Sequence, residues 1–182
     1  LYSVGKIPGG FIRREGKPTE KAVLTARVID RQMRPRFPKD LRNDVSIVNT
    51  VLSVDQDNSP EFASIIGTAV ALCISDIPFN GPVAGVILGL VDVEVVINPN
   101  TEQRLKSEMY VTLSADMEKI IVIEAGANQV TEEVMLDAIK KGHEEIKRII
   151  SFIDDIVKEV GKPKVEYEPY VVPDEIWNTV YE

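Results

Sequence analysis

Residues 83–97, VAGVILGLVDVEVVI, predict the β-hairpin around which the fold is organised. Two runs rich in valine, isoleucine and leucine flank Asp92, and runs of this kind separated by a short turn are typical of paired antiparallel strands. A second pair of apolar runs follows downstream and repeats the arrangement. The strands are expected over residues 83–90, 93–97, 109–113 and 119–124.

Three helices are expected before and after these strands. Thr19 and Ser59 can cap the first two helices, because a hydroxyl oxygen accepts a hydrogen bond from a free backbone N–H. Thr131 begins the third helix. The third helix has an apolar stripe at helical spacing, with His143 within it as a packed, hydrogen-bonded residue. The helices are expected over residues 19–33, 60–75 and 131–160.

One more strand is expected between the first two helices, over residues 45–54. There Val45, Ile47, Asn49 and Val51 alternate with Val48 and Leu52. The complete order is then helix, strand, helix, two pairs of strands and a long helix. This order predicts an α+β domain with a largely antiparallel sheet and packed helices.

Positive charge is concentrated at the start of the chain. The 182 residues have a formal net charge of −8, yet residues 1–42 contain 11 lysines and arginines against 4 acidic residues. A localised basic stretch on an acidic chain is typical of a surface that binds nucleic acid. The alternative is that these arginines pair with carboxylates elsewhere in the fold.

Three features indicate a cytoplasmic protein with no membrane partner. The longest apolar run, residues 63–74, is shorter than the roughly 18 residues needed to span a bilayer, and the first residues lack the pattern of a signal peptide. The single cysteine, Cys73, cannot form an internal disulfide, which favours a reducing compartment.

Four segments in this order and spacing resemble the first core domain of the polynucleotide phosphorylase family. The resemblance covers about residues 2–165, and the chain is therefore expected to be a fragment of a longer protein. The segments are residues 6–16 (KIPGGFIRREG), 27–35 (RVIDRQMRP), 53–58 (SVDQDN) and 77–82 (IPFNGP).

The resemblance implies a fold and a domain organisation. We expect an RNase PH-like domain, of the ribosomal protein domain 2 type, over residues 1–163, with its first strands preceding Leu1. Residues 164–182, rich in proline and acidic residues, are expected to be a linker leading into a helical domain.

The resemblance also implies an activity for the full-length protein. The family forms a homotrimeric ring and degrades RNA from the 3′ end, in a reversible reaction in which inorganic phosphate attacks and nucleoside diphosphates are released. Magnesium is the expected cofactor, bound outside this chain. Single-stranded RNA is the expected partner, with an RNA-degrading complex as a further one.

Two groups of residues are the candidate RNA contacts. Phe11, Ile12, Arg13 and Arg14 match a family segment that grips RNA in the central channel, where an aromatic ring stacks on bases and guanidinium groups pair with phosphates. Ile12 departs from the family's second phenylalanine. The alternative for Phe11 and Ile12 is packing against a neighbouring subunit or the core.

The second group is a row of arginines on the first helix. Arg27, Arg31 and Arg34 recur at spacings of four and three, so they share one helical face and could follow an RNA backbone. The alternative is a buried network with Asp30 and Asp44.

No catalytic or metal-binding residue is expected in this chain. The turn at residues 58–61, NSPE, has a proline and a glutamate where the catalytic sister domain has a serine-rich phosphate site. Tyr110 and Thr112 stand where that domain has a metal-binding Asp and a Lys, and Asp55 and Asp57 fit a solvated turn. The alternatives are a catalytic RNase PH-type nuclease and a purely structural ring scaffold.

Overall fold

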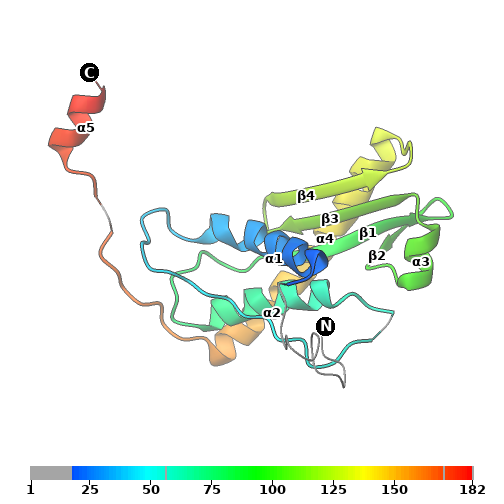
Figure 1. The fold of residues 1–182 in the computed structure, drawn as a ribbon, viewed down its shortest axis with the longest axis horizontal. Helices are drawn as coiled ribbons and strands as arrows, with labels where there is room; N and C mark the ends of the chain where they lie inside the picture. The colour runs from blue at the N-terminus through cyan, green and yellow to red at the C-terminus, as the bar shows by residue number, and fades with distance from the viewer. Residues whose placement is uncertain (1–17, 56, 170, 182) are drawn as a thin grey trace, which may run out of the picture.

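The computed structural model describes residues 18–55, 57–169 and 171–181, and its centre is a four-stranded antiparallel sheet. The strands are β1 (Ala84–Val91), β2 (Glu94–Ile97), β3 (Met109–Ala115) and β4 (Ile120–Ala127), in the order β2-β1-β3-β4 (Figure 1). This confirms the predicted hairpin and the second strand pair. At the tip of the hairpin, Asp92 and Val93 both have a positive φ, which lets two residues reverse the chain.

Helices pack on both faces of the sheet (Figure 1). In that view α4 (Glu132–Val160) crosses behind β1 and β3, whereas α1 (Glu20–Met33) lies in front of one end of the sheet. The helix α2 (Pro60–Ile74) contacts β1, α4 and α1. These helices and the antiparallel sheet confirm the predicted α+β class.

The core lies between α4 and the sheet, where α4 approaches the strands closely at Gly142. A β-carbon at this position would lie 2.9 Å from side-chain atoms of both Leu88 and Leu113, which is shorter than real contacts. Ile146 and Ile150 continue the same face of α4 and are fully buried. The apolar stripe predicted for the long helix is therefore the face that packs on the sheet. Its last member, Val160, is exposed.

The strand predicted over residues 45–54 does not form. Residues 43–55 have no strand assignment, and no backbone hydrogen bond joins them to another segment within the described ranges. A cavity of about 540 Å³ separates part of this segment from α1. The exposure still alternates, since Val48 and Leu52 are 83% and 92% exposed while Val45 is partly buried. The alternation predicted an extended chain correctly, but a strand also needs a neighbour to pair with.

Two short helices complete the chain. The capping box of Asn100 and Gln103 begins α3 (Thr101–Lys106), a helix that the sequence analysis did not predict. Near the C-terminus, α5 (Asp174–Tyr181) stands apart from the rest of the structure (Figure 1). In the part of the chain that the structure describes, every helix falls short of the length or apolar character needed to cross a bilayer.

The segment after α4 is attached to the end of α2. The Lys164 ammonium donates to the carbonyl oxygens of Leu72, Cys73 and Ser75 at 2.7–3.0 Å, where the free carbonyls of a helix end favour a cation. Tyr167 donates to Asp40 at 2.9 Å. The domain boundary at residues 163–164 stays a prediction, and these bonds tie the first residues after it to the domain.

Candidate nucleic-acid interface

The predicted RNA contacts divide into two groups in the structure. Phe11, Ile12, Arg13 and Arg14 lie outside the described residues. The helix α1 carries Arg27 and Arg31, and Arg34 begins the short 3-10 helix (Arg34–Arg36) that directly follows it. The N-cap of α1, Thr19, accepts a hydrogen bond from the Ala22 N–H, as predicted. Ile29 and Met33 bury one side of the helix, together with Gln32, while the arginines lie on the exposed side. The sequence also predicts an apolar stripe on this helix, formed by Ala22, Val23, Ala26, Ile29 and Met33. The buried side is narrower than that stripe, since Ala22, Val23 and Ala26 are exposed.

Arg31 connects α1 to the sheet. Its Nη1 donates to Oε1 of Glu124 on β4, and both side chains are partly exposed. Glu124 is paired across the sheet with Thr112 of β3. The exposed side of α1 therefore borders directly on the face of the sheet to which Thr112 belongs.

Arg34 pairs with the last turn of α1. Its Nε and Nη2 atoms donate to the two carboxylate oxygens of Asp30 at 3.1 and 2.7 Å, and this hydrogen bond raises the pKa of Arg34. The alternative reading, a buried network with Asp30 and Asp44, is wrong in two respects. The pair is exposed to solvent, and Asp44 takes no part in it.

Arg27 differs from its two neighbours. It is exposed on the same side of α1, and no ion pair or hydrogen bond involves it among the residues that the structure describes. An exposed guanidinium without a carboxylate partner keeps all five of its N–H donors for a ligand. Of the three arginines, Arg27 is thus the one that is ready to bind a phosphate.

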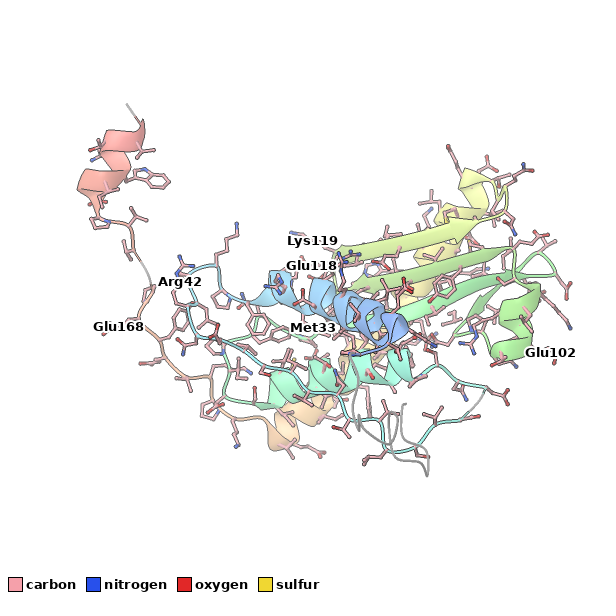
Figure 2. All side chains as sticks on the ribbon, viewed as in Figure 1. Met33, Arg42, Glu102, Glu118, Lys119 and Glu168 are labelled. Atoms are coloured by element: carbon pink, nitrogen blue, oxygen red, sulfur yellow. The ribbon has the colours of Figure 1, made fainter. Side chains whose placement is uncertain are left out.

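A polar cluster that the sequence analysis missed joins α1 to the turn between β3 and β4. Arg36, just after α1, donates to Asp116 Oδ2 at 2.8 Å and to the Asn80 carbonyl at 2.7 Å. The turn, marked by Glu118 and Lys119 in Figure 2, lies beside the C-terminal half of α1. His143 Nε2 lies 3.1 Å from the Asp116 carbonyl, which confirms the predicted hydrogen-bonded histidine.

Asp116 is the centre of this cluster. Burial acts to raise the pKa of its carboxyl group, but hydrogen bonds from the Lys119 and Glu118 backbone and the charge of Arg36 outweigh burial, so the pKa is lowered. Arg36 and Asp116 lie 80 positions apart, and no local pattern links them. The cluster holds α1 against the sheet and so positions the arginine side of the helix.

The N-terminus of α2 is occupied by its own side chains. Ser59 donates to Glu61 Oε2 at 2.6 Å, and the other oxygen of Glu61 contacts Lys21 at 3.4 Å and Thr25 at 3.3 Å. Burial acts to raise the pKa of Glu61, but the bond from Ser59 and the charge of Lys21 outweigh it, so the pKa is lowered. A carboxylate therefore already lies where this helix end could receive an anion.

The remaining candidate positions take ordinary structural roles or lie on the sheet. Asp55 accepts hydrogen bonds from the Asp57 N–H and the Asn58 amide at 2.9 and 2.7 Å, as in a solvated turn. Tyr110 and Thr112 lie on the face of β3 opposite α4, and Tyr110 is exposed. Within the described ranges, no three His, Cys, Asp or Glu side chains gather closely enough to hold a metal ion.

Comparison with known proteins finds two matching family models. The model for domain 1 of the 3′ exoribonuclease family matches residues 1–78, and the model for domain 2 of the same family matches residues 81–145. Together they cover most of the chain.

Several bacterial proteins to which the chain is similar have the same name. The polyribonucleotide nucleotidyltransferases of Ruminiclostridium cellulolyticum and Clostridioides difficile are 69% and 59% identical over all 182 residues. That of Geobacillus kaustophilus is 56% identical over 172 residues. The chain spans only about a quarter of the length of these relatives, 26% of the first.

A solved structure supports the fold. The crystal structure of rice Rrp46 superposes with a TM-score of 0.62 at 16% identity, over 79% of this chain and 69% of that one. At this identity the likeness shows the fold alone, which is the predicted RNase PH-like fold.

Proposed function

Because the chain belongs to the 3′ exoribonuclease family of RNase PH-like proteins, we propose that it is the RNA-binding, ring-forming domain of a phosphate-dependent 3′-to-5′ exoribonuclease. In this proposal the intact protein degrades mRNA, using inorganic phosphate to release nucleoside diphosphates in a reversible reaction, and this domain guides the RNA without doing chemistry. The likeness to polyribonucleotide nucleotidyltransferases over the whole chain supports the activity of the intact protein.

The observation that supports RNA binding is that Arg27 is exposed and has no ion pair with any residue in the described part of the chain. It stands in the basic stretch of residues 1–42, while Arg31 and Arg34 are already joined to Glu124 and Asp30. RNA phosphates are the polyanion for which such a surface is suited. In this proposal Arg27 contacts the RNA backbone, and Arg13 and Arg14 supply further contacts.

Two features support a domain without catalytic chemistry. The helix end at α2, where a phosphate could be bound, faces the Glu61 carboxylate, which would repel an incoming anion. On the sheet, Tyr110 and Thr112 offer a phenol and a neutral hydroxyl, which are poor ligands for a hard cation. The proposal therefore assigns catalysis, and the magnesium that assists it, to residues outside this chain.

The remaining parts of the proposal rest on the family resemblance. They are a homotrimeric ring, a cytoplasmic location and membership of an RNA-degrading complex.

Replacing Arg27 by alanine is expected to weaken binding of single-stranded RNA by the intact protein and to flatten its salt dependence. Loss of one phosphate contact on a single strand lowers the log–log salt slope by about 0.7. The measurement is a titration with a short RNA at several salt concentrations. Lys140→Ala is the matched control, because Lys140 is exposed on α4, on the other side of the sheet. An unchanged slope in Arg27→Ala would place this arginine away from the RNA.

The chain of 182 residues is expected to release no nucleoside diphosphate from poly(A), phosphate and magnesium. The physical reason is that the described residues offer neither a free anion site at α2 nor a charged pair at positions 110 and 112. Chromatography of the products measures the release, with the intact protein as the positive control. Release by the chain alone would favour a catalytic RNase PH-type nuclease, and an intact protein that binds no RNA would favour a structural scaffold.

A further inference from the structure

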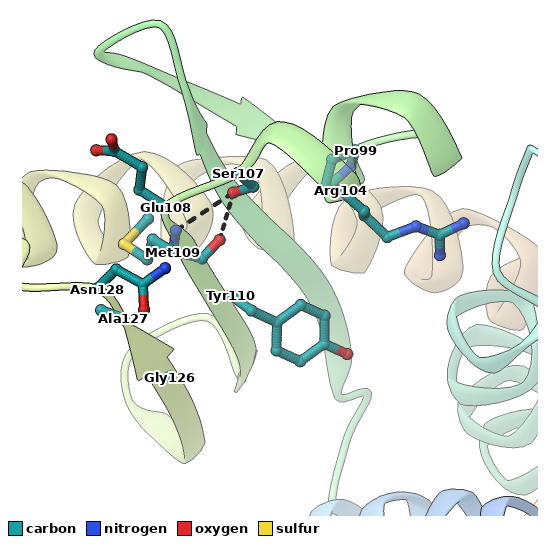
Figure 3. A pocket seen from close by; sticks show the side chains of 9 residues that line it. All are labelled: Pro99, Arg104, Ser107, Glu108, Met109, Tyr110, Gly126, Ala127 and Asn128. Atoms are coloured by element: carbon teal, nitrogen blue, oxygen red, sulfur yellow. Dashed lines mark hydrogen bonds between the residues drawn. The ribbon is translucent and has the colours of Figure 1, made fainter.

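A small cavity lies on the sheet, beyond the end that α1 covers. Its volume is about 200 Å³, and it lies where β3 begins and β4 ends, beside α3. Figure 3 shows the Tyr110 ring and the Arg104 guanidinium projecting to the same side of this cavity. Residues that matter for its chemistry are Arg104, Ser107, Glu108, Tyr110, Gly126 and Asn128.

Tyr110 offers an open aromatic ring. The side chain is 46% exposed, and its hydroxyl accepts only a long bond from Thr112, at 3.4 Å. Its directly opposite cross-strand partners are Gly89 on β1 and Gly126 on β4. The space over Gly89 is filled by the side chains of Pro99 and Ser107, whereas a β-carbon at Gly126 would meet no atom within 4 Å, so the ring is open on its β4 side. A planar ligand can therefore approach the ring without displacing protein atoms.

Arg104 supplies a cation at the same cavity. Its Nη2 donates to the Thr101 hydroxyl at 2.8 Å and to the Asp57 carbonyl at 3.4 Å. A guanidinium has five N–H donors, so three remain, and no carboxylate pairs with Arg104 in the described part of the chain. The bonds to α3 and to the Asp57 turn hold the side chain in place while leaving its charge uncompensated.

The other polar groups of the cavity differ in what they offer. The Ser107 hydroxyl is used within the fold, since it donates to the Met109 carbonyl and accepts from the Leu90 N–H at 2.8 Å. The Glu108 carboxylate points away from Tyr110 and Arg104 (Figure 3). The side-chain amide of Asn128 has no hydrogen-bond partner among the described residues, so it can bond the edge of a base.

We propose that this cavity binds one nucleotide, with the base stacked on Tyr110 and the phosphate held by Arg104. Its volume is below the roughly 300–1,000 Å³ of sites that enclose a whole small molecule, so it fits a single base with the sugar and phosphate left outside. An aromatic ring next to a guanidinium is also the combination with which proteins bind single strands without regard to sequence.

The site rests on the proposed RNA-binding function and extends it across the sheet. Glu124, the partner of Arg31, is paired with Thr112, two residues from Tyr110 on the same face of β3. A strand of RNA that leaves Arg27 and Arg31 on α1 would thus meet Tyr110 next. The nucleotide is either a unit of that RNA or a free nucleoside diphosphate, and the experiment distinguishes the two.

The first test replaces Tyr110 in the intact protein. Tyr110→Ala is expected to weaken binding of a short single-stranded RNA by about 5- to 150-fold, the range for loss of one base-stacking ring. Tyr110→Phe and Tyr110→Trp keep the ring and should bind as well as the unchanged protein. Arg104→Ala should weaken binding and lower the log–log salt slope by about 0.7.

The second test fills the space beside the ring. A β-carbon at Gly126 meets no atom within 4 Å, so Gly126→Val fits the fold, and valine suits a strand. Its side chain would stand next to the Tyr110 ring and is expected to weaken RNA binding as Tyr110→Ala does, with an unchanged melting temperature. This variant keeps the tyrosine, so a loss of RNA affinity would come from the filled cavity and not from a missing ring.

Titration with ADP completes the experiment. In the proposed function the catalytic site of the intact protein also binds ADP, so the number of ADP molecules bound per chain is measured. A fall in that number in Tyr110→Ala and Gly126→Val would assign the site to a free nucleotide, and loss of RNA affinity alone would assign it to a unit of RNA. Unchanged RNA and ADP binding in both variants overturns the nucleotide site while leaving the proposed function intact. Absence of RNA binding by the unchanged protein would instead overturn the proposed function. In that case the ADP titration alone would show whether the cavity binds a nucleotide.

Discussion

Replacing Ile150 by alanine is expected to lower the free energy of unfolding by about 2–5 kcal/mol. Ile150 is fully buried on the face of α4 that packs on the sheet, next to Ile146 and Ile153, which are also fully buried. Truncation removes apolar atoms and leaves a cavity that the sheet cannot close, since Gly142 already holds α4 against Leu88 and Leu113. Denaturant unfolding followed by circular dichroism measures the change.

Phe152 is the matched control, because it lies on the same helix, is larger, and is 62% exposed. Phe152→Ala should change the free energy of unfolding by no more than about 0.5 kcal/mol in this chain. Equal losses in the two variants would contradict the packing of α4. A loss for Phe152→Ala that occurs only in the intact protein would show instead that another part of the protein covers this face.

Replacing either Arg36 or Asp116 by alanine is expected to lower the free energy of unfolding by about 2–3 kcal/mol. The two side chains are only 27% and 15% exposed, and removing one leaves the other charged and poorly solvated. The value lies below the roughly 3–5 kcal/mol of fully buried pairs because water still reaches the Arg36 side. Both variants also remove the ion pair that joins Arg36, just after α1, to Asp116 in the β3–β4 turn.

A double-mutant cycle measures this pair, with Arg34 and Asp30 as the exposed comparison. That second pair should contribute about 0–1 kcal/mol, because its charges stay in water. The Arg36–Asp116 contribution should also depend on pH. Since the pKa of Asp116 is lowered in the folded state, its stabilisation is complete above the ordinary aspartate pKa and is lost as the pH falls through the folded pKa. Equal contributions from the two pairs at neutral pH would contradict the burial of Arg36 and Asp116.

The elements that the sequence predicted correctly are those whose signals lie within a few residues. The hairpin around Asp92 follows from two apolar runs and a turn, and α4 follows from a stripe with a period near four. The cap at Thr19 and the proline at the first position of α2 are signals of the same kind. Each depends on hydrogen bonds or side-chain neighbours in one turn of helix or one hairpin, so the local sequence contains all the necessary information.

The strand expected over residues 45–54 shows what local signals cannot predict. Alternation predicts an extended chain that exposes every second side chain, and the exposed Val48 and Leu52 agree with it. A strand, however, is a property of two segments, and no described segment supplies the partner. The helix α3 was missed for the opposite reason, because its capping box is local but its six residues contain little apolar pattern.

By itself, the sequence determined the fold class, the basic start of the chain and the family to which it belongs. Only the tertiary structure decided which carboxylate each arginine contacts. Arg31, Arg34 and Arg27 share one helical face, yet Arg31 reaches Glu124 and Arg34 reaches Asp30, while Arg27 has no such partner among the described residues. The same holds for Tyr110, whose ring is open on one side because strand register places Gly126 of β4 opposite it. The packing of the whole domain sets the strand register and brings distant segments together. No short stretch of sequence specifies that packing.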